Sequence, residues 1–173
     1  NAGVRHVSIH ARKAWLQGLS PKENRDIPPL DYPLVLAMKG AFPQLSISIN
    51  GGIGNLDEVE GFLAKGLDGV MVGRAAYQTP WDILGDADRR IFGADNPCDT
   101  PHDAVAEMIP CIEAHLTEGG RLHSVTRHML GLFAGRPGAR VWRRVLTEGA
   151  HRDGAGVDLI DEALSAVLSC QAA

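Results

Sequence analysis

The stretch LSISINGG, residues 45–52, sets the fold expected for this chain. Its alternating β-branched residues predict a strand over 45–49, and the glycines after Asn50 predict a tight turn. Residues 4–10 and 69–74 repeat this order of a short apolar strand followed by hydrogen-bonding groups. In α/β barrels the C-terminal ends of the strands carry the chemistry. We therefore expect these three strand ends to contribute to one site.

The segments between the strands predict helices and hence an α/β fold with parallel strands. Apolar residues recur at helical spacing over 30–42, and Asn55 is a suitable N-cap for a helix through Lys65. This pattern is typical of a TIM (β/α)8 barrel, which takes about 250 residues. Because the 173 residues hold three such strands, we expect residues 1–94 to be the C-terminal part of such a barrel and not a complete one.

Residues 93–101 interrupt this repeat, and the sequence after them predicts helices alone. We expect a small all-α helical bundle as a second domain over residues 95–173. The helices expected before and after the interruption are 81–92, 103–116, 121–133, 139–146 and 157–168. Pro110 is expected to kink its helix or to sit near a break in it.

The composition excludes several classes of protein. The hydrophobic content of 45% and the net charge of −4 are typical of a folded domain and do not by themselves indicate a nucleic-acid binder. The three cysteines lack a CxxC pair, which argues against a disulfide framework or a metal site and favours a reducing cytoplasm. No secretory signal or membrane-spanning stretch is found. Because the chain starts at Asn1 and enters a strand at once, we interpret it as a piece of a longer polypeptide.

Two glycine turns predict a phosphate site at the strand ends, because glycine lets backbone N–H groups approach an anion closely. The residues assigned to this site are Asn50, Gly51, Gly52, Gly73 and Arg74. His10 and Arg12 lie two positions apart on an extended segment, so both are candidates to face the same ligand. The alternative is that the glycines only form tight turns and that His10 is a core histidine bonded to the backbone.

Two cationic regions indicate an RNA partner. The loop of residues 11–29 is long for a connection between a strand and a helix. Its stacking and phosphate-binding groups are Trp15, Lys22, Asn24 and Arg25. Residues 119–147 contain no acidic residue, and their basic side chains are Arg121, His123, Arg127, His128, Arg136, Arg140, Arg143 and Arg144. A polyanion fits such a run, although solvated helix faces also carry charges of this kind.

The chain resembles the C-terminal half of the tRNA-dihydrouridine synthases, in particular of their A (DusA) type. The motifs that carry the resemblance are HARKAWLQGLSPKENR (10–25), PPLDYP (28–33), SINGGI (48–53), DGVMVGRAAYQTPW (68–81) and HSVTRHMLGLFAGRPGARVWRRVL (123–146). The resemblance covers nearly the whole chain. It implies an FMN barrel followed by a helical tRNA-binding domain, and an enzyme that reduces uridine near position 20 of the tRNA D-loop to 5,6-dihydrouridine with NADPH.

The same resemblance implies roles for individual residues. His10 contacts the FMN, the loops at 50–52 and 73–74 hold its phosphate end, and Arg12 lies on the flavin side. The residues implied to bind tRNA and set its orientation are Lys22, Arg25, Arg140 and Arg143. None of Cys98, Cys111 and Cys170 matches the family's cysteine acid, which is expected in the preceding half of the barrel.

We therefore expect this segment alone to be inactive and to hold FMN weakly. Two alternatives stay open. A small-molecule FMN-barrel oxidoreductase has similar phosphate loops but no need of a basic helical appendage. A non-catalytic RNA-binding module would bind tRNA without flavin. The sequence does not identify the modified uridine, and a monomer is the expected oligomeric state.

Overall fold

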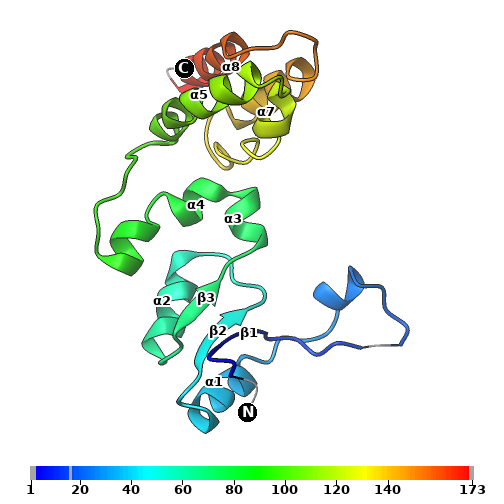
Figure 1. Ribbon diagram of the computed structural model, residues 1–173, viewed down its shortest axis with the longest axis vertical. Helices are drawn as coiled ribbons and strands as arrows, with labels where there is room; N and C mark the ends of the chain where they lie inside the picture. The colour runs from blue at the N-terminus through cyan, green and yellow to red at the C-terminus, as the bar shows by residue number, and fades with distance from the viewer. Residues whose placement is uncertain (1–2, 16, 172–173) are drawn as a thin grey trace. The chain divides into compact units, whose positions relative to one another are not determined.

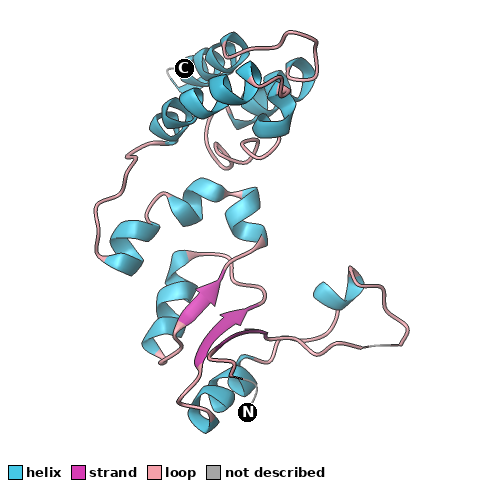
Figure 2. Cartoon of the chain, viewed as in Figure 1, coloured by secondary structure: helices cyan, strands magenta, loops and turns pink. Residues whose placement is uncertain are grey.

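The computed structural model describes residues 3–15 and 17–171 (Figure 1). The chain divides into two compact units, Asn1–Ala75 and Ala76–Ala173. Strands occur in the first unit, whereas the described residues of the second form helices, turns and loops (Figure 2). None of the helices in the described part of the chain is long and apolar enough to cross a membrane.

The first unit is built on a parallel sheet with the strand order β1 (His6–His10), β2 (Ser46–Asn50), β3 (Gly69–Met71). The register pairs His10 with Asn50 and Asn50 with Met71. The carboxyl ends of the three strands therefore lie side by side, as the sequence predicted.

Two helices connect these strands and are capped by the side chains before them. The Asp31 carboxylate accepts from the Leu34 N–H at the start of α1 (Tyr32–Ala41), and Asn55 accepts from the Glu58 N–H at the start of α2 (Leu56–Ala64). The predicted N-cap at Asn55 is thus confirmed. A one-turn 3-10 helix, η1 (Glu23–Arg25), interrupts the long loop after β1.

The sheet has an apolar face and a polar face. Ile47 and Ile49 are fully buried, and they are joined in the core by Val35 of α1 and Phe62 of α2. Because side chains alternate along a strand, Ser46, Ser48 and Asn50 lie on the opposite face. On β1 the corresponding residues, His6, Ser8 and His10, are exposed. The crossover helices thus cover one face and leave the polar face, with its strand-end residues, uncovered within this unit.

The second unit encloses its own core. Its helices are the end of α3 (Arg74–Gln78), α4 (Pro80–Leu84), the π-helix η2 (Asp88–Phe92), α5 (Pro101–Thr117), α6 (Leu122–Thr126), α7 (Ala139–Gly149) and α8 (Asp158–Gln171). Trp142 is completely buried, contacts the Phe133 ring edge-on, and donates from Nε1 to the Met129 carbonyl at 3.0 Å. The polar end of this large side chain is therefore satisfied inside the core.

Two of the predicted helices are wrong in extent. The expected helix 81–92 is divided at Gly85, whose α-carbon lies so close to Trp81 that an added Cβ would sit 2.7 Å from the Trp81 carbonyl oxygen. The expected helix 121–133 ends at Thr126, and turns carry the following residues into the core. Pro110 lies inside the continuous helix α5, where a kink or a nearby break was expected.

Candidate functional site

A histidine–asparagine pair connects the three strand ends. His10 Nδ1 lies 2.7 Å from Asn50 Oδ1, and Asn50 Nδ2 donates to the Met71 carbonyl at 2.8 Å. Because an amide oxygen only accepts, His10 Nδ1 carries the proton. His10 is exposed, and its Nε2 has no hydrogen-bond partner among the described residues. This nitrogen is therefore available to a ligand above the carboxyl edge of the sheet.

The glycine turn after β2 is packed on its inner side. Gly51 and Gly52 have φ values of +120° and +70°, and the Tyr32 hydroxyl donates to the Gly51 carbonyl at 2.9 Å. Burial raises the pKa of Tyr32, with a smaller contribution from Glu58. A Cβ at Gly52 would lie 2.6 Å from Leu30 Cδ1, so a side chain there would have to displace the tip of Leu30.

The outer side of both glycine turns offers unused donors. Within the described residues, the backbone N–H groups of Gly52, Gly73 and Arg74 donate no hydrogen bond. Gly52, Gly73 and Arg74 are all exposed. Exposed N–H groups at two neighbouring strand ends have the chemistry that binds a phosphate, so the residues present fit a phosphorylated cofactor.

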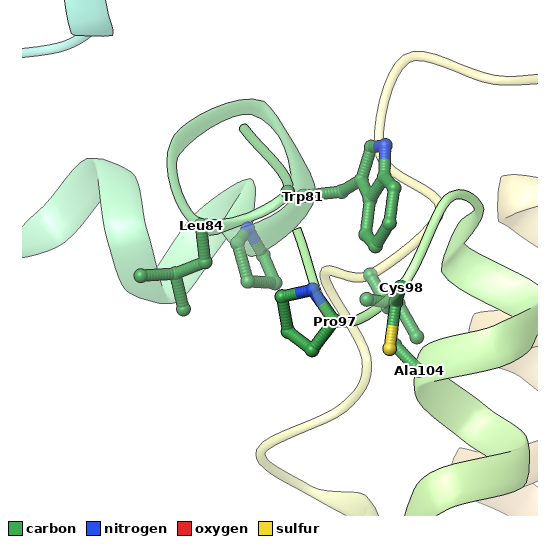
Figure 3. A pocket seen from close by; sticks show the side chains of 8 residues that line it. Trp81, Leu84, Pro97, Cys98 and Ala104 are labelled. Atoms are coloured by element: carbon green, nitrogen blue, oxygen red, sulfur yellow. The ribbon is translucent and has the colours of Figure 1, made fainter. Parts of the chain in front are cut away.

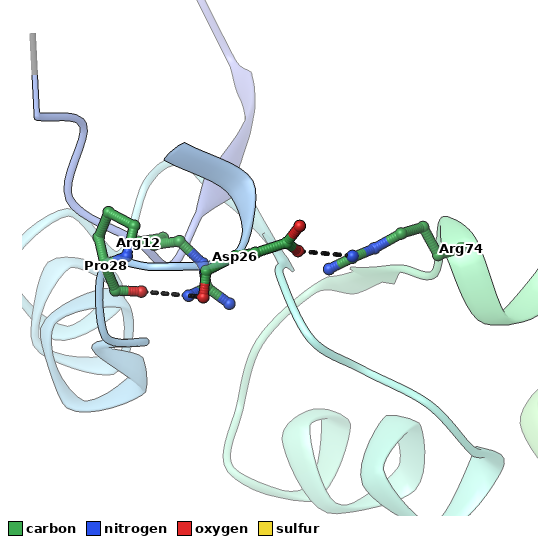
Figure 4. A network of polar contacts seen from close by, with 4 residues as sticks. All are labelled: Arg12, Asp26, Pro28 and Arg74. Carbon is green, nitrogen blue, oxygen red and sulfur yellow. Dashed lines mark hydrogen bonds and ion pairs between the residues drawn. The ribbon is translucent and has the colours of Figure 1, made fainter. Parts of the chain in front are cut away.

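Arg12 and Arg74 are both bonded to the loop that follows β1 (Figure 4). Arg12 Nη1 donates to the Pro28 carbonyl and, at 3.0 Å, to the Asp26 carbonyl. The carboxylate of Asp26 in turn accepts from Arg74 Nη1 at 2.7 Å. The network ties the base of the loop together. Sequence analysis did not single out Asp26, and no local signal distinguishes it from the other acidic residues of the chain.

The loop of residues 11–29 divides its polar groups between its own structure and the surface. The Asn24 side chain accepts from the Trp15 N–H at 2.7 Å and donates to the Trp15 carbonyl at 2.9 Å, so this amide, expected to face RNA, holds the loop closed. Lys22 and Arg25 are exposed, and their side chains have no partner among the described residues.

The basic run of the second unit contains paired and unpaired members. Arg136 binds Asp82 at 3.1 Å, and Arg121 binds Asp153 at 3.3 Å. The exposed arginines of α7 differ, because their side chains form no hydrogen bond or ion pair within the described part of the chain. They are Arg140, Arg143 and Arg144.

The cysteines offer no acid in a polar site. Cys98 lines an apolar pocket of about 200 Å³ together with Trp81, Leu84 and Pro97 (Figure 3). Burial raises the pKa of its thiol, and the nearby carboxylate of Glu107 adds to that shift. Cys111 and Cys170 are exposed on α5 and α8. Among the described residues, no three His, Cys, Asp or Glu side chains are grouped as a metal site.

A comparison with protein families identifies the family of this chain. The family model described as dihydrouridine synthase (Dus) matches residues 1–169. The chain belongs to the dihydrouridine synthase family. The resemblance stated from the sequence motifs is thereby confirmed.

Several curated proteins similar to this Dus chain share one name. It is 50% identical over 165 residues to the tRNA-dihydrouridine(20/20a) synthase of Vibrio cholerae, which is 95% of this chain and 50% of the relative. It is 58% identical over 159 residues to the protein of the same name from Salmonella typhimurium, covering 92% and 47%. The Escherichia coli K12 protein of that name is 56% identical over 159 residues, covering 92% and 46%. The chain thus spans about half the length of the curated relatives it matches.

Proposed function

We propose that the full protein containing this Dus sequence is a tRNA-dihydrouridine synthase that reduces uridine at positions 20 and 20a of the D-loop, using FMN and NADPH. The observation that carries the proposal is the identity of 50% to 58%, over more than nine-tenths of the chain, to proteins named tRNA-dihydrouridine(20/20a) synthase. No small-molecule oxidoreductase is among the relatives compared above.

The strand ends of the first unit would hold the cofactor. The free N–H groups at Gly52 and Gly73 would bind the FMN phosphate, and His10 Nε2 would meet the flavin from the end of β1. Asn50 would act by orienting His10, because its amide fixes which imidazole nitrogen faces outward. Bound FMN would supply the hydride that reduces the C5–C6 double bond of uracil.

Arg12 and Arg74 would serve this site less directly. Arg12 is bonded to two loop carbonyls, so its predicted place on the flavin side is that of a residue shaping the loop beside the cofactor. Arg74 is 62% exposed and paired with Asp26. Its guanidinium can therefore release this carboxylate and bind a phosphate oxygen without exposing a buried group.

The tRNA would be bound by four unpaired cations, which come from both units. They are Lys22, Arg25, Arg140 and Arg143. We assign residues 1–94 to the end of a TIM barrel and residues 95–173 to a helical tRNA-binding domain. The compact units divide earlier, after Ala75, and Trp81 packs against the core of the second unit. The acid that protonates the base is assigned to none of the three cysteines of this chain, and we expect the 173 residues alone to be inactive.

The test is reduction of tRNA by the full-length protein. Unmodified tRNA and NADPH are added to wild-type protein, and dihydrouridine is measured and mapped by mass spectrometry. The flavin content is read from the absorption spectrum. We expect dihydrouridine at positions 20 and 20a, loss of both flavin and activity in Asn50→Ala, and wild-type activity in the control Cys98→Ser.

Each other outcome has a defined meaning. Flavin-loaded wild type that leaves tRNA unreduced would overturn the proposed function. Tight tRNA binding by a wild-type protein that never carries flavin would favour the non-catalytic RNA-binding module. An inactive Cys98→Ser enzyme with normal flavin content would move the acid into this half of the protein.

A further inference from the structure

The second unit contains an open cleft that the cofactor site does not use. Six residues line it: Tyr77, Gln78, Arg127, Leu130, Gly131 and Arg143. Its volume is about 400 Å³, within the range of about 300–1,000 Å³ common for small-molecule sites. Two guanidinium groups and no carboxylate line this cleft, so it selects for an anion.

One of the two guanidinium groups is held in place by a histidine. Arg127 Nε donates to His128 Nε2 at 3.0 Å, and His128 Nδ1 lies 3.1 Å from the Tyr77 hydroxyl. Because Arg127 can only donate, His128 Nε2 accepts and the proton sits on Nδ1. Nδ1 therefore donates to the Tyr77 oxygen, which leaves the phenolic hydrogen free to donate. Arg127, His128 and Tyr77 form a chain that fixes one wall of the cleft.

The second guanidinium comes from α7. Arg143 is exposed and has no partner within the described residues. Gly131 lets the walls approach each other, because a Cβ there would collide with the Gln78 carbonyl oxygen. Tyr77 is 57% exposed, so part of its aromatic ring remains open to a stacking partner beside the two arginines.

We propose that this cleft binds one unstacked nucleotide of the tRNA, with its base against Tyr77 and its phosphate between Arg127 and Arg143. The inference rests on the proposed function, because it takes tRNA as the substrate. An aromatic ring next to cations without a carboxylate partner is the combination by which proteins hold single-stranded nucleotides. Planar guanidinium groups bind phosphate oxygens through paired hydrogen bonds. The adenosine phosphate end of NADPH shares this chemistry, so the test separates the two sources.

The experiment measures the salt dependence of tRNA affinity for the full-length, FMN-loaded protein. The variants are Tyr77→Ala, Tyr77→Phe, Arg127→Gln and Arg143→Gln, with Arg152→Gln as a control. Arg152 is exposed and lines a different cleft, so the control makes the same change in net charge elsewhere in this unit. The KM for tRNA, the KM for NADPH and the flavin content are measured for each variant.

The two kinds of contact give different signatures. Loss of one phosphate contact lowers the slope of log affinity against log salt by about 0.7–0.9, and we expect this for Arg127→Gln and Arg143→Gln. Loss of one stacked base weakens binding by about 5- to 150-fold, and we expect this for Tyr77→Ala with little change in slope. Tyr77→Phe keeps the ring and should retain most of the affinity. The control Arg152→Gln should bind tRNA as wild type does. The flavin content and the KM for NADPH should be unchanged in all the variants.

Three results would overturn the proposal that the cleft binds a tRNA nucleotide and would leave the proposed function intact. One is wild-type tRNA affinity in Tyr77→Ala. Another is an equal change of slope in Arg152→Gln and in the two cleft variants. The third is a raised KM for NADPH with an unchanged KM for tRNA. A wild-type protein that binds and reduces no tRNA would instead count against the proposed function itself.

Discussion

The arginines at the strand ends of the first unit and those on α7 of the second unit are used in opposite ways. Arg12 and Arg74 are bonded to the carbonyls and the carboxylate of one loop. Arg140 and Arg143 are exposed and have no partner in the described part of the chain. The same residue type therefore builds a loop in one region and leaves its charge for a partner in the other.

This difference shows which arginines can be assigned to RNA. An unpaired exposed cation releases a counterion when it meets a phosphate, whereas a paired one must first give up its internal partner. The paired arginines of the second unit, Arg121 and Arg136, follow the behaviour of the first unit. The charge run seen in the sequence thus overstates the number of groups available to tRNA, and most of the available ones lie on α7.

The largest expected effect is a loss of stability at the glycine that positions the start of α7. Gly138, before α7, has φ +84°, and an added Cβ would lie 2.8 Å from Val167 Cα, which is backbone of α8. Gly138→Ala should destabilise the second unit by about 2–5 kcal/mol, because it adds left-handed strain to an overpacked contact. Gly52→Ala has the same sign of φ but meets the flexible tip of Leu30, and should cost about 1–2 kcal/mol.

Hydrogen exchange of the two variants, resolved by peptide, measures the loss of stability separately in the first unit and in the second unit. Gly138→Ala should also weaken tRNA binding, since it disturbs the helix that carries Arg140 and Arg143. Equal stability losses at the two glycines would mean that the contact with α8 backbone does not fix α7.

The next effect separates an arginine that builds structure from one that does not. Arg12→Ala removes two bonds to loop carbonyls, and we expect a loss of about 1–3 kcal/mol. Arg144→Ala, on the free surface of α7, should stay within about 0.5 kcal/mol of wild type. Thermal unfolding gives the stabilities, and trypsin cleavage after Lys22 or Arg25 reports opening of the loop. Slow, wild-type cleavage in Arg12→Ala would remove the structural role assigned to this arginine.

Local signals were sufficient for the elements that position the site. The strands at 46–50 and 69–71, their parallel order and the Asn55 cap all follow from spacing and residue type. The glycine turns were also visible, because positive φ and close approach leave few other residues possible. Tertiary contacts decided the remainder. The helical period over 121–133 was real in its apolar residues, yet Met129 and Phe133 reach the core from turns.

The partners of the charged groups were the least predictable part of the site. Asp26 lies 14 residues after Arg12 and 48 before Arg74, and nothing local indicates that one loop residue serves both. The Tyr77–His128 contact spans 51 residues and was missed for the same reason. Sequence reasoning found the cations but not which of them were already paired.

A smaller effect is expected when the carboxylate that pairs with Arg74 is removed. The ion pair of Arg74 and Asp26 is exposed, at 62% and 48%, so Asp26→Asn should cost at most about 1 kcal/mol. Freed from its partner, Arg74 should hold the FMN phosphate at least as well as in wild type. Flavin retention during dialysis should therefore be equal or higher in Asp26→Asn and lower in Arg74→Gln. Parallel loss of flavin in both would mean that the pair itself supports the site.

The smallest expected effect is a pH dependence confined to the second unit. His123 stacks on His151 with ring centroids 4.6 Å apart, and its Nδ1 is buried without a partner. Burial lowers the pKa of His123, and the charges of His151, Arg121 and Arg127 lower it further. The folded state thus binds a proton less readily than the unfolded state, where histidine titrates near pH 6.5.

The direction of the pH effect follows because the pKa of His123 is lower in the folded than in the unfolded state. The contribution of His123 is fully present above about pH 6.5 and is lost as the pH falls through its lowered value in the folded protein. His151→Asn removes one of the repelling charges, so the melting temperature of this variant should fall less than that of wild type between about pH 7.5 and pH 5.5. Equal falls in the two proteins would show that the stacked histidine does not hold down the pKa of His123.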